Sequence, residues 1–293
     1  MGNTRGFSTA LYSATLDSKK YSRAVSHNQV FKSRQIDPSM DPKDITLREC
    51  RVSEKHPDPL PIVIALDVTG SMGKIPFYMV KEGLPKLVTA LMERGVQSPQ
   101  ILFLAIGDVT CDSAPLQVGQ FEASDELLLH WLENTYIEGG GGGNTGESYN
   151  LGLYFAGYHT AHDRSELKGK KGYYFSIGDE PFLEGLNKYQ LETVIGRPYQ
   201  EPVKSNKELL EKAQELYKVH HLHLTETYAG NSFQEKIKQQ LGQVVTLVSD
   251  YNEIADVIAS LIIDNEQLEG SLNQPVVSNI PSDSSDEKEM EVL

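Results

Sequence analysis

Apolar runs alternate with amphipathic segments between residues 61 and 264. The runs PIVIALD and QILFLAIGD are almost continuously apolar, which is typical of strands covered by helices on both faces of a parallel sheet. Further strands are predicted at KGYYFSIGDEPF, HHLHLTE and VVTLVSD, and a short edge strand at PLQVGQF. This alternation predicts an α/β fold, in which helices cover both faces of a doubly wound, mostly parallel sheet.

Apolar residues at helical spacing fill the segments between these strands. In KIPFYMVKEGLPKLVTALMERG the apolar positions from Ile75 to Leu91 share one face, and Pro85 is predicted to kink the helix. Ser124 is placed to cap the helix SDELLLHWLENTY. Two more helices are predicted at ESYNLGLYFAGYHT and YNEIADVIASLIID.

The pattern divides the chain into three regions. Residues 1–60 mix polar residues with prolines and form an N-terminal extension, which either wraps the core or awaits a partner. Residues 61–264 form the α/β domain. Residues 265–293 carry seven acids and one lysine with few apolar residues, so we expect an acidic, disordered tail.

Composition narrows the class of protein. With 39% hydrophobic and 23% charged residues, the chain suits a soluble globular protein, and it contains no apolar stretch of transmembrane length and no signal-peptide pattern at its start. Cys50 and Cys111 lack metal or redox spacing, so reduced thiols in the cytoplasm are expected. A net charge of −14 argues against a nucleic-acid surface, and we expect neither a nucleic-acid nor a membrane partner.

Three oxygen-rich loops follow predicted strands or open a predicted helix. The first is Asp67-Val68-Thr69-Gly70-Ser71, the second is GGGGGNTGES at 139–148, and the third contains Asp179 after YYFSI. Ligands of such sheets bind outside the carboxyl ends of the strands, so we expect the loops to lie together. Their hydroxyl and carboxylate oxygens are the donors that a hard divalent cation prefers.

This arrangement resembles a von Willebrand factor type A domain, whose metal-ion-dependent adhesion site reads Asp-x-Ser-x-Ser, then a loop Thr, then an Asp after the fourth strand. Thr69 occupies the first Ser position and keeps the hydroxyl. The resemblance covers residues 61–264 and implies a Rossmann-like fold, as in intracellular members from bacteria and phages. It also implies a Mg²⁺ site, open to Mn²⁺ or Ca²⁺, whose residues are Asp67, Thr69, Ser71, Thr145 and Asp179.

The resemblance further implies how the site works. In the family the two hydroxyls bind the metal directly and the carboxylates act largely through water, which leaves the cation able to take a carboxylate from another protein. The expected function is therefore metal-dependent binding of a protein partner that presents an Asp or Glu, without catalysis. The second loop departs from the family pattern, because Gly146-Glu147-Ser148 follows Thr145. Glu147 or Ser148 could take the place of Thr145.

A phosphatase of the haloacid dehalogenase type is the alternative function. In that interpretation Asp67 is the nucleophile, Lys170 or Lys171 the charge clamp, and Asp179 with Glu180 the Mg²⁺ ligands. Thr69 stands where ordinary members carry a general-acid aspartate, and the glycine-rich loop has no role there. An α/β domain with a vestigial site is a third hypothesis.

Two other groups of polar residues invite a metal interpretation. His220, His221 and His223 suggest zinc, but their alternation in HHLHLTE suits one polar face of a strand. Asp108 and Asp112 follow a predicted strand and are slightly better explained as polar residues at a strand end than as ligands.

Overall fold

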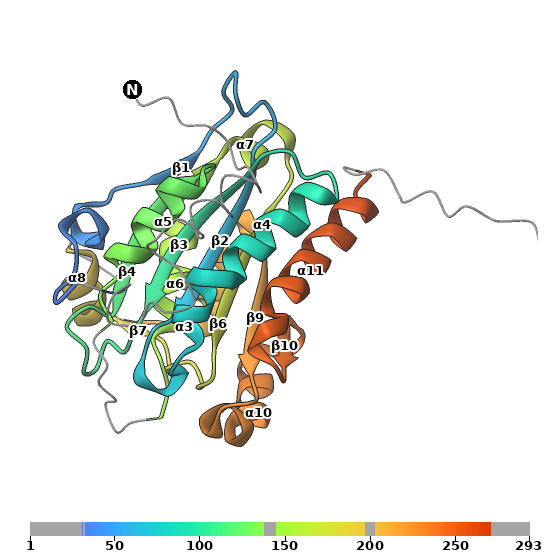
Figure 1. Cartoon of the computed structure of the whole chain (residues 1–293). Coiled ribbons are helices and arrows are strands. Elements are labelled where there is room, and N and C mark those ends of the chain that lie inside the picture. Colours follow the sequence, from blue (N-terminus) through green and yellow to red (C-terminus); the bar gives the residue numbers. More distant parts are fainter. Residues whose placement is uncertain (1–30, 32, 138–144, 197–202, 271–293) are drawn as a thin grey trace, which may run out of the picture.

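Six strands form the central sheet of the computed structural model, which describes residues 31, 33–137, 145–196 and 203–270 (Figure 1). The spatial order is β10-β9-β6-β2-β3-β4, and all neighbours are parallel except the pair of β3 with the edge strand β4. The strands are β2 (Leu60–Asp67), β3 (Pro99–Ile106), β4 (Leu116–Glu122), β6 (Gly172–Gly178), β9 (Tyr217–Leu224) and β10 (Val245–Val248). The expectation of a mostly parallel α/β sheet with a short edge strand at 115–121 is confirmed.

Helices pack against the sheet in two apolar layers. Alternate residues of β2 belong to different layers: Ile62 and Ile64 lie in one, and Val63 and Ala65 in the other. The first layer includes α3 (Ile75–Tyr78), α4 (Leu84–Glu93), α5 (Asp125–Asn134) and α11 (Ile254–Leu268). The second includes α6 (Tyr149–Tyr158), α8 (Lys188–Ile195), α9 (Asn206–Leu216) and α10 (Tyr228–Leu241).

Small elements complete the fold. β1 (Arg48–Cys50) pairs in parallel with β5 (Thr160–His162), which leads into α7 (Asp163–Lys168), and β7 (Leu186–Asn187) pairs with β8 (Val203–Lys204). Short 3₁₀ turns lie at η1 (Pro38–Met40), η2 (Pro42–Asp44), η3 (Gly70–Met72), η5 (Gly242–Val244) and η6 (Tyr251–Glu253). Within the described residues, no helix has the length and hydropathy needed to cross a membrane.

The N-terminal extension contributes to the core where the structure describes it. Met40, Ile45 and Cys50 are buried, and β1 adds the strand pair with β5. Residues 1–30 lie outside the described part of the chain, as do residues 271–293 of the acidic tail.

The predicted helix after β2 changes its winding before Pro85. Residues Met79–Gly83, labelled η4, form a π-helical turn between α3 and α4, and the Leu84 N–H donates to the carbonyl of Met79. Proline lacks an N–H and its ring clashes with the carbonyl four residues earlier, so a wider turn relieves the conflict. Where the sequence predicted a kink, the structure has a π-helical turn directly before the helix that contains Pro85.

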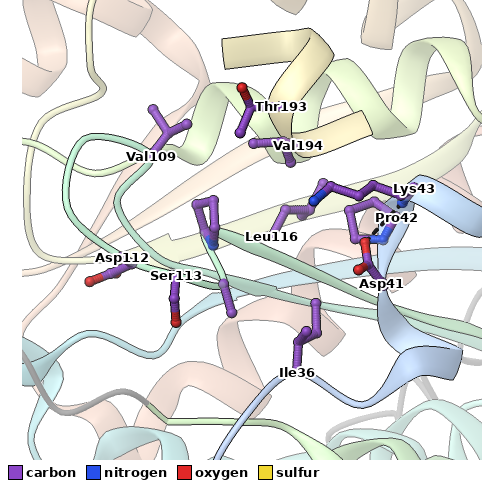
Figure 2. Close-up of a pocket in the computed structure, with 12 residues that line it drawn as sticks. Ile36, Asp41, Pro42, Lys43, Val109, Asp112, Ser113, Leu116, Thr193 and Val194 are labelled. Atoms are coloured by element: carbon purple, nitrogen blue, oxygen red, sulfur yellow. Dashed lines mark hydrogen bonds between the residues drawn. The ribbon is translucent and has the colours of Figure 1, made fainter. Parts of the chain in front are cut away.

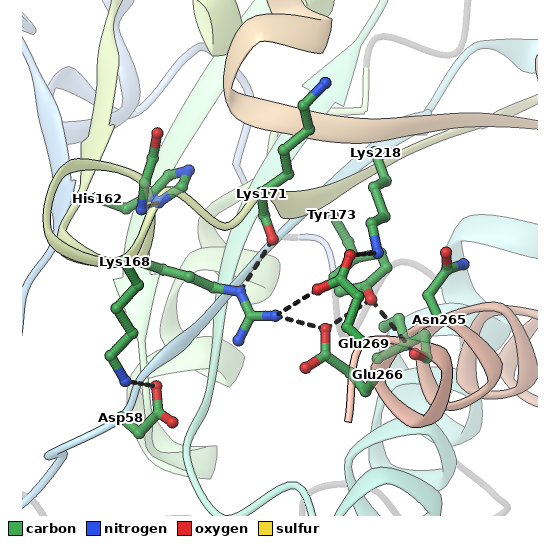
Figure 3. A network of polar contacts seen from close by, with 12 residues as sticks. Asp58, His162, Lys168, Lys171, Tyr173, Lys218, Asn265, Glu266 and Glu269 are labelled. Carbon is green, nitrogen blue, oxygen red and sulfur yellow. Dashed lines mark hydrogen bonds and ion pairs between the residues drawn. The ribbon is translucent and has the colours of Figure 1, made fainter. Parts of the chain in front are cut away.

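A buried ion pair lies at the end of the sheet where the parallel strands begin (Figure 3). Arg164 of α7 donates to Glu266 of α11 at 2.6 Å and to the Lys171 carbonyl at 2.9 Å, and the Tyr173 hydroxyl donates to Glu266 at 2.7 Å. Arg164 and Glu266 are both buried. This network joins the end of α11 to α7 and to the start of β6.

Glu266→Gln should lower the free energy of unfolding by about 2–3 kcal/mol, because it removes the nearer of the two carboxylates that pair with the buried Arg164 guanidinium and leaves only Glu269, at 3.8 Å. Lys168→Gln, on the helix of Arg164, breaks an exposed pair with Asp58 and should cost less than about 1 kcal/mol. Urea unfolding of the two variants makes the comparison. Equal losses would show that the buried pair contributes no more than the exposed one.

Candidate functional site

The first loop folds back on the carboxylate that ends β2. Asp67 is fully buried, and its Oδ1 accepts from the Thr69 N–H at 2.8 Å and from the Thr69 hydroxyl at 2.6 Å. The η3 turn follows at once, which brings Ser71 Oγ to 3.2 Å from Thr69 Oγ1. The two hydroxyls therefore lie side by side at the end of a central strand.

The third loop lies next to the first because β2 and β6 are neighbours. Asp179 follows β6 directly and is fully buried. Ser71 Oγ donates to its Oδ1 at 2.8 Å, while its Oδ2 is buried without a hydrogen-bond partner among the described residues. Four of the five residues predicted for the metal site, Asp67, Thr69, Ser71 and Asp179, thus come together.

The second loop presents three candidates in different surroundings. Residues 138–144 lie outside the described part, and Thr145 is exposed. Ser148 Oγ accepts from the Val109 N–H at 2.8 Å and so joins the turn after β3. Glu147 is buried, and its Oε2 has no hydrogen-bond partner among the described residues.

Backbone hydrogen bonds hold Glu147 against the third loop. Its N–H donates to the Pro181 carbonyl at 2.9 Å, and its carbonyl accepts from the Leu183 N–H at 3.0 Å. The Gly146 N–H donates to the Glu180 carboxylate at 2.6 Å. The second and third loops are therefore joined through Gly146 and Glu147, and the charge of Asp67 raises the pKa of Glu147.

Tyr149, which lies in the helix predicted at ESYNLGLYFAGYHT and was not among the predicted site residues, is a direct neighbour of the site. Its hydroxyl donates to Asp67 Oδ2 at 2.5 Å. The ring reaches this position across Gly178, where an added Cβ would overlap the ring and hydroxyl. A tyrosine at the start of a helix gives no indication of a partner 82 positions away in the sequence.

Negative charge accumulates at the site without a compensating ion pair. Burial and then the nearby Asp179 raise the pKa of Asp67 to about 7. Burial and then the charges of Asp67 and Glu180 raise the pKa of Glu147 to about 10. No ion pair formed within the described residues includes Asp67, Asp179 or Glu147. Such carboxylates are stabilised by a proton or by a cation.

The oxygen atoms of the site suit a hard divalent cation if the hydroxyls of Thr69 and Ser71 are among the ligands. Within the described residues, no three or more His, Cys, Asp or Glu side chains are grouped so that they could hold a metal ion. Two hydroxyls with two hydrogen-bonded carboxylates are oxygen donors of the kind that Mg²⁺, Mn²⁺ and Ca²⁺ take. A cation at this site would therefore depend on Thr69 and Ser71.

The three histidines of β9 do not converge. His221 and His223 are fully buried, and His221 Nδ1 lies 2.9 Å from the Ser176 hydroxyl. His220 precedes them in the strand and stacks on Phe175, which belongs to the opposite layer. No group of the described residues has the composition that a zinc site would need.

The two lysines, one of which the phosphatase alternative needs beside Asp67, lie at the opposite ends of the strands from it. Lys170 and Lys171 precede β6, whereas Asp67 ends the parallel neighbour β2. The register places Tyr173 opposite Ile62, so Lys171 lies roughly 20 Å along the strands from Asp67. Figure 3 shows Lys171 beside the ion-pair network described above, where its backbone carbonyl accepts from Arg164. In this structure neither lysine can clamp a phosphoryl group on Asp67.

A small pocket adjoins the turn after β3 (Figure 2). It lies between the N-terminal extension, this turn and α8, and its lining includes Lys43, Asp112 and Val194. Asp108 and Asp112 mainly organise the turn, since the Asp108 N–H donates to Asp112 Oδ2 and the Thr110 N–H donates to Asp108 Oδ1, both at 2.8 Å. Their charges also act on Glu147.

Comparisons with known proteins give no family for the chain. No family model and no curated protein matches it. The pilus adhesin SpaC from Lactobacillus rhamnosus GG, in its open conformation, is similar at 12% identity and a TM-score of 0.46, over 71% of this chain and 30% of SpaC. Proximal thread matrix protein 1 of the mussel byssus is similar at 15% identity and a TM-score of 0.43, over 74% of this chain and 48% of that protein. The chain spans less than half of either protein, and scores this low support no inference about function.

Gly178→Ala should lower the free energy of unfolding by about 2–3 kcal/mol, because the added methyl group overlaps the Tyr149 ring in a packed core. Gly119→Ala in β4 is the control for a tight contact without overlap: its Cβ would lie 3.1 Å from the Phe103 carbonyl oxygen, so a smaller loss is expected. Urea unfolding measures both. A loss at Gly178 no larger than that at Gly119 would mean that Tyr149 does not need the open position.

Proposed function

We propose that the chain is a doubly wound module of the von Willebrand factor type A kind, which holds a divalent cation and through it binds a protein partner that presents an Asp or Glu. Mg²⁺ is the cation proposed, with Mn²⁺ or Ca²⁺ as substitutes. No catalytic role is proposed. The free thiols of Cys50 and Cys111 support a cytoplasmic location.

The direction of two hydroxyl protons carries the proposal. Thr69 Oγ1 donates its proton to Asp67, and Ser71 Oγ donates its proton to Asp179. A hydroxyl oxygen has two lone pairs besides its proton, so both oxygens keep lone pairs for a cation. The carboxylates act as acceptors that orient the hydroxyls, which is the arrangement in which outer groups align the direct ligands.

Charge explains why a partner's acid would bind only with the cation present. Residues 61–264 contain 27 acidic and 16 basic residues, and the site itself contains buried carboxylates. A second protein's carboxylate would be repelled by this surface in the absence of a cation. A bound divalent cation supplies local positive charge, and two neutral hydroxyl ligands leave more of that charge than two further carboxylates would.

Ser71→Ala should abolish cation binding without unfolding the chain, because Ser71 is exposed and contributes an oxygen instead of core packing. Isothermal titration with Mg²⁺ and Mn²⁺ should show at least a tenfold loss of affinity, the scale expected when a group at a metal site is removed. Ser232→Ala, at an exposed position of α10, is the control and should bind as the wild type does. Wild-type protein that takes up no divalent cation would overturn the proposal.

The same variants test the partner and the alternative function. Partner capture should require Mg²⁺, disappear with chelator and disappear in Ser71→Ala. Equal capture with and without cation contradicts the proposed mode of binding. Hydrolysis of a phosphate ester by the wild type that is lost in Asp67→Asn would instead support the phosphatase.

The second-loop ligand can be decided by a pair of substitutions. Glu147→Gln should lower cation affinity more than Thr145→Ala, because Glu147 is buried with an oxygen that has no hydrogen-bond partner among the described residues, whereas Thr145 is exposed. Titration with Mg²⁺ measures both. If Thr145→Ala gives the larger loss, the ligand is the threonine that the family pattern predicts.

A further inference from the structure

One buried phenol contacts two loops of the site and directly follows the other in sequence. Tyr149 is the first residue of α6 and follows the second loop directly. Its hydroxyl donates to Asp67 Oδ2 in the first loop at 2.5 Å and accepts from the Glu180 N–H in the third loop at 3.4 Å. The hydroxyl therefore links the first loop to the third, while the backbone of Tyr149 continues the second.

The ring of Tyr149 is fixed by its surroundings. Its centroid lies 4.9 Å from that of Phe182 and 5.3 Å from that of His221. Gly178 lies directly beneath it, with no side chain to displace it. The side chain is fully buried, so the hydroxyl has little freedom to leave Asp67.

This contact gives the two oxygens of Asp67 separate partners. Oδ1 accepts from Thr69, and Oδ2 accepts from Tyr149. Without the phenol, Oδ2 would be left buried and unpaired, and the carboxylate could rotate to find another donor. Rotation would move Oδ1 away from the Thr69 hydroxyl, whose proton direction decides where its lone pairs point.

We propose that Tyr149 is a positioning residue, which fixes Asp67 and thereby Thr69 so that the site selects Mg²⁺ over the larger Ca²⁺. The inference rests on the proposed function and concerns its cation selectivity. Mg²⁺ demands near-octahedral geometry at about 2.0–2.1 Å, whereas Ca²⁺ accepts six to eight oxygens at about 2.3–2.6 Å in flexible arrangements. A Thr69 hydroxyl held in one direction therefore favours the smaller ion.

Tyr149→Phe removes the hydroxyl and keeps the ring. Isothermal titration of the full chain should show the Kd for Mg²⁺ rising about tenfold, as for other groups that orient metal ligands, and the Kd for Ca²⁺ changing by less than about threefold. The control is Tyr174→Phe. Tyr174 is also fully buried in the same apolar layer, and its hydroxyl has no hydrogen-bond partner among the described residues. This variant should keep both affinities.

Each outcome separates the inference from the function on which it rests. Unchanged Mg²⁺ affinity in Tyr149→Phe overturns the positioning role, and so does an equal loss for Mg²⁺ and Ca²⁺, which would indicate general damage to the site. Loss of selectivity in Tyr174→Phe as well would overturn it, because that hydroxyl does not contact Asp67. A wild-type chain that binds neither ion overturns the proposed function and this inference together.

Discussion

Two carboxylates are buried at the ends of adjacent central strands, and the rest of the candidate site is arranged around them. Asp67 and Asp179 are both fully buried, and neither joins an ion pair within the described residues. Burying a charge is costly unless it is paired or hydrogen-bonded. Here the donors are neutral: the hydroxyls of Thr69, Ser71 and Tyr149 and one backbone N–H. Neutral donors orient the carboxylates and leave their charge uncancelled.

The opposite edge of the same sheet shows that the fold can pair buried charges completely. There Arg164 meets Glu266 directly, and Tyr173 adds a hydrogen bond to the same carboxylate. Removing one partner of such a pair is expected to cost several kcal/mol. The two ends of the sheet can be compared because they belong to the same strands and bury their charged groups to a similar degree. The carboxylates without an ion pair lie where the parallel strands end. Ligands bind at this end in sheets of this class.

The sequence pattern predicted the elements whose structure depends on residues close together in the chain. The strands at 61–67 and 100–106 are apolar on both faces, and Ser124 accepts from the Leu127 N–H as the predicted cap. Helices α9 and α10 were not predicted from the sequence, since their sequences are largely polar and bury only a few residues each. The turn Asp67–Ser71 was predictable because its groups are two residues apart. The contact between Tyr149 and Asp67 was not, because it depends on how α6 packs over β6.

Gly178 shows how a locally unfavourable residue can reveal a site. Glycine in a strand weakens it, having no side chain to pack and more backbone freedom to lose. At this position a side chain would occupy the path by which the Tyr149 ring reaches Asp67. The glycine that weakens the end of β6 thus also leaves room for the Tyr149 hydroxyl, which orients the buried Asp67 carboxylate. Places where local preference yields to tertiary structure are expected at functional sites, and the end of β6 fits that expectation next to Asp179.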